Sequence, residues 1–309
     1  MKTIDKEKPG NIILTDSGLE TTLIYHHNIA LPHFAAFILL NNPQQKSLLD
    51  RYFRQHLDLA VRYKTGFVLE SVSWRANSDW GYKLGYQDKE LDFVNQKAIR
   101  QLFAIKNEYA GSVSPIYVSG CIGPRSDGYQ IKHKMTPVEA KEYHINQVAS
   151  FKKAKADFAS ALTMNYSDEA MGIVLAAREK KLPVVISFTV ETDGSLPDGE
   201  KLDEAISRID KDTQQYPLYY MINCAHPTHF VRQLVDADWT KRIRGIRANA
   251  SCKSHAELDE SVELDSGNKI ELADWYTTIR EKLPNLLVYG GCCGTDISHI
   301  ENICQKIAV

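Results

Sequence analysis

The stretch TPVEAKEYHINQVASFKKAKADFASALTMN, residues 136–165, holds a helix pattern followed by a strand pattern. Apolar side chains recur at helical spacing through its first part, where Thr136 suits the N-cap, Pro137 the first turn and Glu139 the capping-box position. Residues 157–165 then form a short, mostly apolar run that is typical of a buried strand. The stretch therefore predicts one helix–strand repeat of an α/β fold.

The same alternation continues to both ends of the chain. The predicted strands are residues 11–18, 66–73, 115–123, 157–165, 183–190, 218–224, 243–250 and 286–294. The predicted helices are residues 43–63, 89–109, 136–154, 167–181, 203–213, 229–235, 270–283 and 296–307. Strands that alternate with helices imply right-handed crossovers and a parallel sheet, and eight repeats predict a closed (β/α)8 TIM barrel.

We expect the barrel to be a single α/β domain over residues 1–309. The alternative fold is an open, doubly wound sheet, which also alternates strands and helices. A dinucleotide site in such a sheet would need a G-x-G-x-x-G turn after the first strand, and the sequence has none there. The barrel is the better prediction because it also brings the unusual residues of the chain to one face.

Composition excludes several classes of function. The formal net charge is −2 and charges of both signs are interspersed, so no electrostatic footprint for nucleic acid or an anionic membrane is present. The chain has no apolar run of the roughly 18 to 20 residues that cross a bilayer, and its start is too polar for a signal peptide. We expect a cytoplasmic protein, monomeric or homodimeric, that acts on small molecules.

Three cysteines are predicted to lie close together. Cys224 ends the sixth predicted strand, and Cys292 and Cys293 end the eighth. The carboxyl ends of all strands in a (β/α)8 barrel meet at one face. Three thiolates suit Zn²⁺ and would leave its fourth position open, which is typical of a catalytic rather than a structural zinc site. Disulfides among the three are the alternative, which a reducing compartment disfavours.

The neighbouring thiols Cys292 and Cys293 can face one ion only where the backbone turns, because successive side chains of a strand point to opposite sides. The sequence GGCCG surrounds them with Gly290, Gly291 and Gly294, and we expect these glycines to supply the conformational freedom for that turn.

At these residues the chain resembles the homocysteine S-methyltransferase family. The resemblance rests on GGCCGT at 290–295, MINC at 221–224 and LTDSGLET at 14–21, with weaker similarity at 119–124, 187–199 and around Asn249. It implies zinc-dependent transfer of a methyl group from a sulfonium or ammonium donor to homocysteine or a related thiol, giving methionine. S-Methylmethionine, S-adenosylmethionine and betaine are candidate donors. The family pattern makes Cys224, Cys292 and Cys293 the zinc ligands.

The resemblance also implies residues that contact the substrate. Asp16 matches an acid near the substrate, although a barrel-mouth Asp can instead accept backbone N–H bonds. Asn223 precedes a ligand and could orient a thiolate, or could satisfy its own backbone. Asn249 is expected in the substrate site with them.

Several positions depart from the family pattern, and the one that bears most directly on the substrate is residue 162. Leu162 stands where the family usually has a Glu that binds the substrate amino group, and leucine cannot pair with an ammonium. Glu70, at the end of the second strand, or Glu191, after the fifth, could replace that carboxylate. The alternative is a diverged zinc- or thiol-binding barrel protein without methyltransferase activity. A zinc hydrolase on this barrel is disfavoured because the first strand carries no H-x-H.

An aromatic, polar tract at residues 73–86 follows the second strand. Trp74 and Trp80 could stack on a cationic methyl donor. The alternative, which we favour, is a loop that packs these rings on the barrel. His226 and His229 follow Cys224, and we expect them at a helix start rather than on the metal.

Overall fold

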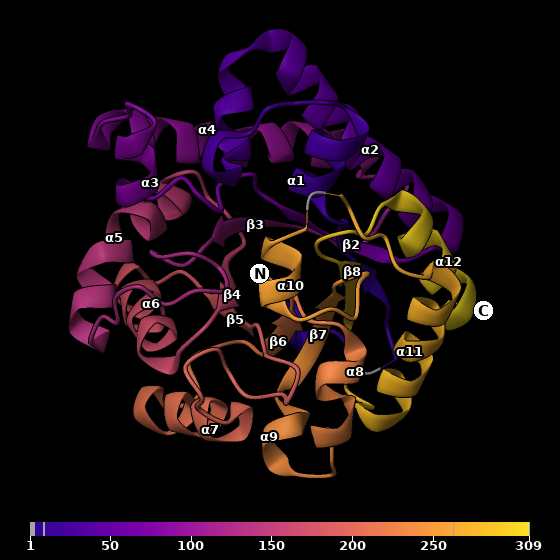
Figure 1. Cartoon of the computed structure of the whole chain (residues 1–309). Helices are drawn as coiled ribbons and strands as arrows, with labels where there is room; N and C mark the ends of the chain where they lie inside the picture. The colour runs from indigo at the N-terminus through magenta and orange to yellow at the C-terminus, as the bar shows by residue number, and fades with distance from the viewer. Residues whose placement is uncertain (1–3, 9, 262, 309) are drawn as a thin grey trace.

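The eight predicted strands are all present and form one closed parallel barrel in the order β1 to β8 (Figure 1). The computed structural model describes residues 4–8, 10–261 and 263–308. The strands are β1 Ile13–Leu14, β2 Gly66–Glu70, β3 Ile116–Ile122, β4 Phe158–Met164, β5 Val184–Phe188, β6 Tyr220–Asn223, β7 Ile243–Ala248 and β8 Val288–Gly291. The barrel closes where Ile13 and Leu14 pair with Val288 and Tyr289. The prediction of a (β/α)8 TIM barrel is confirmed.

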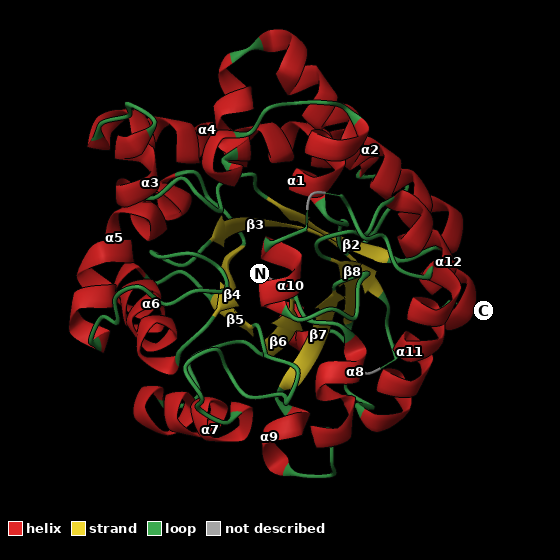
Figure 2. Cartoon of the chain, viewed as in Figure 1, coloured by secondary structure: helices red, strands yellow, loops and turns green. Residues whose placement is uncertain are grey.

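Most helices surround the strands on the outside of the ring, and α10, at His255–Asp259, lies over its opening (Figure 2). The helices are α1 Leu19–Thr21, α2 Pro43–Tyr63, α3 Ser78–Lys83, α4 Asp88–Tyr109, α5 Pro137–Lys153, α6 Ser167–Lys180, α7 Leu202–Thr213, α8 Pro227–Phe230, α9 Asp238–Lys241, α10 His255–Asp259, α11 Lys269–Lys282 and α12 Ile297–Ile307. Short helical turns lie at Ile4–Lys6, Thr22–His26, Pro32–Phe34, Ala36–Asn41 and Val231–Gln233.

Local sequence signals explain where the long helices begin. At α5 the Thr136 hydroxyl accepts a bond from the Glu139 N–H, and the Glu139 carboxylate accepts one from the Thr136 N–H at 2.8 Å, so the predicted capping box is confirmed. At α2 the Asn42 side chain caps two N–H groups, with Pro43 in the first helical position.

The helix predicted over residues 229–235 is wrong in extent. The structure has α8 at Pro227–Phe230, followed by a separate turn at Val231–Gln233. Phe230 leaves the helical backbone region at φ −128°, which ends the α-helical hydrogen bonding after one turn. His226 caps the start of α8, so its predicted place at a helix start is confirmed.

Apolar side chains fill both sides of the barrel wall. Inside the barrel one cluster includes Ile13, Val68, Tyr117, Phe158, Val185, Met221 and Val288. Outside it a larger cluster packs strands against helices and includes Leu14, Phe67, Val118, Ala159, Ile186, Ile222, Ile246 and Tyr289. The alternation follows from the two-residue period of a strand, and burial of each large apolar side chain stabilises the fold by roughly 1.5–3 kcal/mol.

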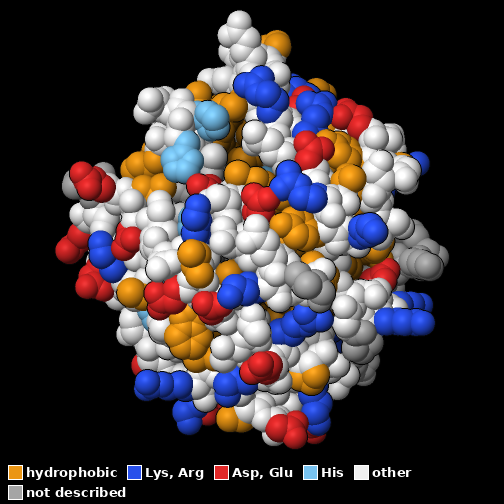
Figure 3. Space-filling view, turned by 90° about the vertical axis from the view of Figure 1, so that its right-hand side faces the viewer, with side chains coloured by type: hydrophobic (Ala, Val, Ile, Leu, Met, Phe, Trp, Pro, Cys, Tyr) orange, Lys and Arg blue, Asp and Glu red, His pale blue; other side chains and the backbone are white. Residues whose placement is uncertain are grey.

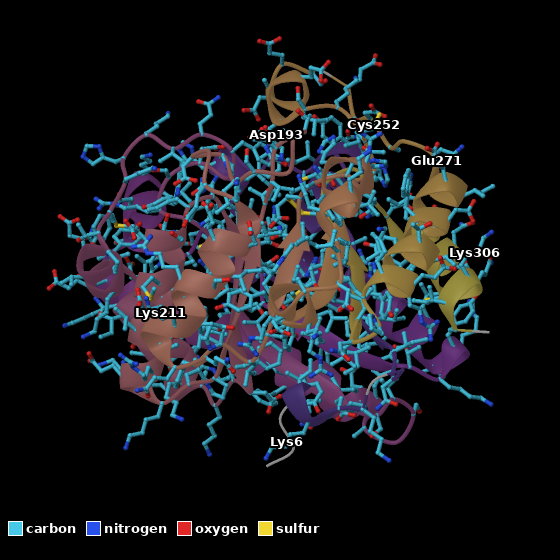
Figure 4. All side chains as sticks on the ribbon, turned by 90° about the horizontal axis from the view of Figure 1, so that it is seen from below. Lys6, Asp193, Lys211, Cys252, Glu271 and Lys306 are labelled. Carbon is cyan, nitrogen blue, oxygen red and sulfur yellow. A yellow bond between two sulfur atoms is a disulfide. The ribbon has the colours of Figure 1, made fainter. Side chains whose placement is uncertain are left out.

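The carboxyl ends of the strands define one end of the molecule. In Figure 4, Asp193 and Cys252, which follow β5 and β7, lie at one end, and Lys6, which precedes β1, lies at the other. The segment that follows β7 carries α10 across the opening of the ring (Figure 1). Within the described chain, every helix is too short or too polar to cross a membrane.

Candidate metal and substrate site

The structure brings Cys224, Cys292 and Cys293 together, with their sulfur atoms all within 4.8 Å of one another. Cys224 follows β6 directly and has a left-handed backbone at φ 55°, while the other two follow β8. The Cys224 N–H donates to the Arg247 carbonyl and the Cys292 N–H to the Ala248 carbonyl, so β7 holds both segments in register. Strand ends thus fix the cluster from both sides.

Cys224 and Cys292 form a disulfide in this structure, and Cys293 is a free thiol. Cys293 Sγ lies 3.9 Å from Cys224 Sγ. The sequence favoured three free thiols, whereas the structure records the oxidised alternative for one pair. A metal ion would need the reduced form, because the thiolate is the ligand.

Two of the three glycines around the paired cysteines serve a different purpose from the one predicted. Only Gly294 has a left-handed backbone, at φ 79°. At Gly290 a Cβ atom would lie 2.2 Å from Thr15 Cγ2, and at Gly291 it would lie 2.1 Å from Thr295 Oγ1. These two glycines are required because β8 lies too close to its neighbours for any side chain, not because the backbone turns there.

Three polar side chains hold the backbone and sulfur atoms of the cluster. Asn223 donates to Thr163 Oγ1 at 2.8 Å and to Cys292 Sγ at 3.8 Å, and its own oxygen accepts from Ser187 and from the Thr163 N–H. The Asn223 side chain therefore bonds to other residues and not to its own backbone, which was the alternative. Asn249 Nδ2 donates to the Cys224 carbonyl at 3.0 Å, and His255 Nε2 lies 2.9 Å from the same oxygen.

The cysteines open into a cavity of about 350 Å³ at the carboxyl ends of the strands. Segments after β1, β2, β3 and β7 form its walls. Its charged lining residues are Asp16, Glu20, Glu70, Arg75, Asp127, Arg247, Asp259, Glu263 and Asp265. Seven carboxylates against two guanidinium groups make the described lining suitable for a cationic ligand. The outer surface carries no comparable bias on the face seen in Figure 3, where both signs are mixed.

Asp16 lies in the cavity wall and is paired with Arg247. Arg247 Nη2 is 2.9 Å from Asp16 Oδ1, and the two side chains are only 7% and 5% exposed. The hydroxyls of Thr15 and Tyr52 also donate to the Asp16 carboxylate. The predicted alternative, a carboxylate that accepts backbone N–H bonds, is not the arrangement found, because a guanidinium group from β7 occupies that place.

Glu70 lies in the same wall and is only partly satisfied. Its Oε1 accepts a hydrogen bond from Ser160 at 2.8 Å, but Oε2 has no hydrogen-bond partner among the described residues. Burial raises the pKa of Glu70 to about 7, against the opposing charge of Arg247. Glu70 is therefore a buried carboxyl group that retains the capacity to accept a hydrogen bond or pair with a cation.

Leu162 lines the cavity and Glu191 does not. Glu191 pairs with His255 at 2.9 Å, which occupies its carboxylate outside the cavity wall. Asn249 is also absent from the cavity lining, and its contact is with the Cys224 carbonyl. Of the residues predicted to contact substrate, Asp16, Glu70 and Asn223 line the cavity.

The rings of the aromatic tract after β2 pack against cationic side chains of the same chain, and of the two tryptophans only Trp74 lines the cavity. The Arg75 guanidinium carbon lies 4.1 Å from the ring centroids of both Trp74 and Trp80. Lys83 covers Trp80 at 4.0 Å as well. The prediction that these rings pack on the protein is confirmed, and their cation is a side chain of the same chain.

The histidines near Cys224 lie away from its sulfur. His226 bonds to Thr228 at the start of α8, and its pKa falls to about 4 because of burial. His229 Nε2 is 2.9 Å from the Cys252 carbonyl. Neither belongs to the cysteine cluster.

Several residues of the site were missed in the sequence, and four of them bear on its charge or on the cysteines. Arg247 and Arg75 carry charge into the cavity wall, Glu20 is a second carboxyl whose pKa burial raises to about 7, and Tyr129 donates a 3.8 Å bond to Cys293 Sγ. Of these four residues, only Arg247 could have been identified from the sequence, because it is a charged residue within a predicted buried strand, where a charge is rare unless it is paired. Tyr129 stacks on His255 at 3.9 Å between ring centroids, a contact between the loop after β3 and the start of α10 that leaves no sequence pattern.

Comparison with known families and structures agrees with this architecture. A family model described as homocysteine S-methyltransferase matches residues 13–307. A search of curated proteins gave no match.

Among solved structures, the homocysteine methyltransferase MmuM from Escherichia coli is similar in its metallated form, with 17% identity, 98% of each chain covered and a TM-score of 0.73. Its oxidised form is 16% identical, with 98% of this chain and 97% of the MmuM chain covered and a TM-score of 0.74. Its apo form gives 16% identity, the same coverage and a TM-score of 0.67. At these identities the structural likeness speaks for the fold.

Proposed function

Because the chain belongs to the homocysteine S-methyltransferase family, and is a methyltransferase on that ground, we propose that it acts with zinc. The proposed reaction moves a methyl group from a sulfonium or ammonium donor to the sulfur of homocysteine or a related thiol. With homocysteine as the acceptor, the product is methionine. The observation that carries the proposal is the meeting of three cysteine sulfurs, within 4.8 Å of one another, beside a cavity.

The donor set fits zinc when it is reduced. Cys224, Cys292 and Cys293 offer three soft sulfur ligands and leave one coordination position for a substrate. Burial raises the pKa of the Cys293 thiol to about 11, so the site without metal favours thiols over thiolates. Bound zinc would supply the chemistry of keeping the substrate sulfur deprotonated near neutral pH.

The other residues of the site would then position the cysteine ligands and the two substrates. Asn223, at the end of β6, donates to Cys292 Sγ, while Asn249 and His255, both after β7, contact the carbonyl of Cys224. The excess of carboxylates in the cavity lining favours a cationic methyl donor over an anionic one. Alignment of the donor methyl with the acceptor sulfur is the main task left to the protein.

For the acceptor's ammonium group we propose Glu70. Glu191, the other predicted replacement, pairs with His255 outside the cavity lining, and the charge of Asp16 is already neutralised by Arg247. Leu162 offers no charge, whereas Glu70 has an unpartnered oxygen in the cavity wall. An ammonium at Glu70 would satisfy that oxygen and stabilise the ionised form of the carboxyl group.

The test begins with fully reduced protein, since a Cys224–Cys292 disulfide removes two of the three ligands. Zinc content is measured after dialysis, and methionine is quantified by mass spectrometry with homocysteine and each of S-methylmethionine, S-adenosylmethionine and betaine. Cys293→Ser should lose zinc and product, and the exposed Cys252 gives a matched control, Cys252→Ser, that should lose neither.

Two results would redirect the proposal. Zinc and thiol binding without methyl transfer from any donor would support a diverged binding protein instead. Absence of both zinc and thiol binding by the reduced protein would refute the metal site itself.

A further inference from the structure

The two arginines of the cavity wall differ in how well their charges are compensated. Arg247 donates to the Gly291 carbonyl at 3.1 Å, to Thr15 Oγ1 at 3.1 Å and to the Ser17 carbonyl at 3.4 Å, and it pairs with Asp16. Every nitrogen of its guanidinium group therefore has an acceptor. Arg247 needs no ligand from outside the protein.

Arg75 is buried to the same degree but has fewer partners. Its side chain is 4% exposed, and it donates to the Ser126 carbonyl at 2.8 Å. Its one carboxylate partner, Asp127, lies 3.3 Å away and has a side chain 38% exposed, so water screens that attraction. Arg75 Nε has no acceptor among the described residues. Burial lowers the pKa of Arg75 to about 10 in spite of Asp127.

The surroundings hold the Arg75 guanidinium group in a fixed orientation. Trp74 and Trp80 lie on it at 4.1 Å each, so its faces are covered and only its N–H edge can bind another group. A planar N–H edge held in this way matches the geometry of a carboxylate, which Arg binds in a bidentate manner. The preorganisation lowers the entropic cost of binding such a group.

We propose that Arg75 recognises the carboxylate of a substrate, and that the cavity is built for amphoteric substrates. Glu70 supplies the opposite charge in the same cavity, with its unpartnered Oε2. Arg75 Nε and Glu70 Oε2 are the atoms without a partner, and a molecule that carries both an ammonium and a carboxylate would satisfy both groups. The inference rests on the proposed function, and the carboxylate can come from the acceptor amino acid or from the methyl donor.

Binding to the reduced, zinc-loaded protein by calorimetry tests the proposal without requiring turnover. Homocysteine is compared with 3-aminopropane-1-thiol, and S-methylmethionine with 3-aminopropyl-dimethylsulfonium, each pair differing only in the carboxylate. The parent protein should prefer the carboxylate form of at least one pair roughly tenfold or more. Arg75→Met, which keeps the stem between the tryptophans, should abolish that preference, and Arg75→Lys should retain part of it. The pair that loses its preference identifies the source of the carboxylate.

Arg125 provides the matched control. It also stacks on an aromatic ring, at 4.7 Å from the Tyr143 centroid, and pairs with one carboxylate at 2.7 Å, but it does not line this cavity. Arg125→Met should leave both preferences unchanged, and thermal unfolding verifies that each variant is folded. The proposal is overturned if the parent shows no carboxylate preference in either pair, or if folded Arg75→Met keeps the parent's preference. Product formation is a separate measurement, so failure of methyl transfer with intact discrimination refutes only the proposed function.

Discussion

Replacement of Arg247 by methionine should be among the most destabilising single changes in the barrel. The side chain pairs with Asp16 at 2.9 Å where both partners are almost fully buried, and it donates to three further oxygens. Removal of one partner of a buried ion pair costs about 3–5 kcal/mol, because the remaining charge is left desolvated. In Arg247→Met the Asp16 carboxylate would keep only the hydroxyls of Thr15 and Tyr52.

The measurement is the free energy of unfolding from urea titrations of reduced, metal-free protein, monitored by circular dichroism. Asp16→Asn is measured alone and with Arg247→Met, because the double variant contains no unpaired charge. We expect the double variant to be more stable than the sum of the two single losses predicts, by about 1–3 kcal/mol. The matched control is Arg54→Met, which breaks a pair with Glu108 whose side chains are 37% and 44% exposed. This control should cost at most about 1 kcal/mol.

The reasoning is refuted if Arg247→Met loses no more stability than Arg54→Met, or if the two single losses at Asp16 and Arg247 simply add. Either result would mean that the pair is effectively solvated. Asp16 would then be available to a substrate ammonium, and the case for Glu70 would weaken.

Three further predictions concern the barrel and its site. Burial raises the pKa of Glu70 from 4.5 to about 7, so the folded state binds this proton more tightly than the unfolded chain, and the stability that the proton contributes is lost as the pH rises through 7. The stability of Glu70→Gln relative to the parent should therefore rise between pH 5 and 8, by about 3 kcal/mol at most. Parallel stability–pH curves for the two proteins would contradict this. Gly290→Ala should lower the free energy of unfolding by about 1–3 kcal/mol because the new Cβ would lie 2.2 Å from Thr15 Cγ2. The control Gly111→Ala, whose Cβ would have no atom within 4 Å, should change the free energy of unfolding little. Equal urea midpoints for the two variants would refute the close-approach argument. Thr136→Ala should lower the free energy of unfolding by about 1 kcal/mol in the same titration through loss of the α5 cap, and Thr136→Ser should keep the stability of the parent. An alanine variant as stable as the parent would show that the cap does not stabilise the protein.

Features of the fold that depend on neighbouring residues were predictable from the sequence. The α5 capping box depends on Thr136 and Glu139, three positions apart, and the strand of residues 157–165 on a local apolar run, observed as Phe158–Met164. The cysteine cluster was predictable for a different reason, because a closed barrel brings the ends of β6 and β8 to one face whatever the intervening helices do. The failed prediction at residues 229–235 lay where one backbone angle, at Phe230, ended a helix that side-chain periodicity would have continued.

Contacts between strands were not predictable, because they depend on distances that periodicity does not contain. Gly290 and Gly291 could be read as flexible, yet their Cα atoms face Thr15 and Thr295 too closely for a side chain. Arg75 could be assigned to a loop, but its burial between Trp74 and Trp80 depends on how that loop folds back on α3.

Charge pairing decides which of the carboxylates in the cavity is free to bind a substrate. The sequence predicted Asp16 near the substrate and Glu70 as one replacement for the ammonium-binding Glu, and it could not show how either carboxylate is paired. For an ammonium to bind Asp16, it would have to displace a guanidinium group that has four acceptors, and it would leave that group buried without its counter-charge. Binding at Glu70 Oε2 breaks no hydrogen bond, because this atom has no partner among the described residues. The free-energy difference therefore favours Glu70, and Leu162 can be apolar without leaving an ammonium unpaired.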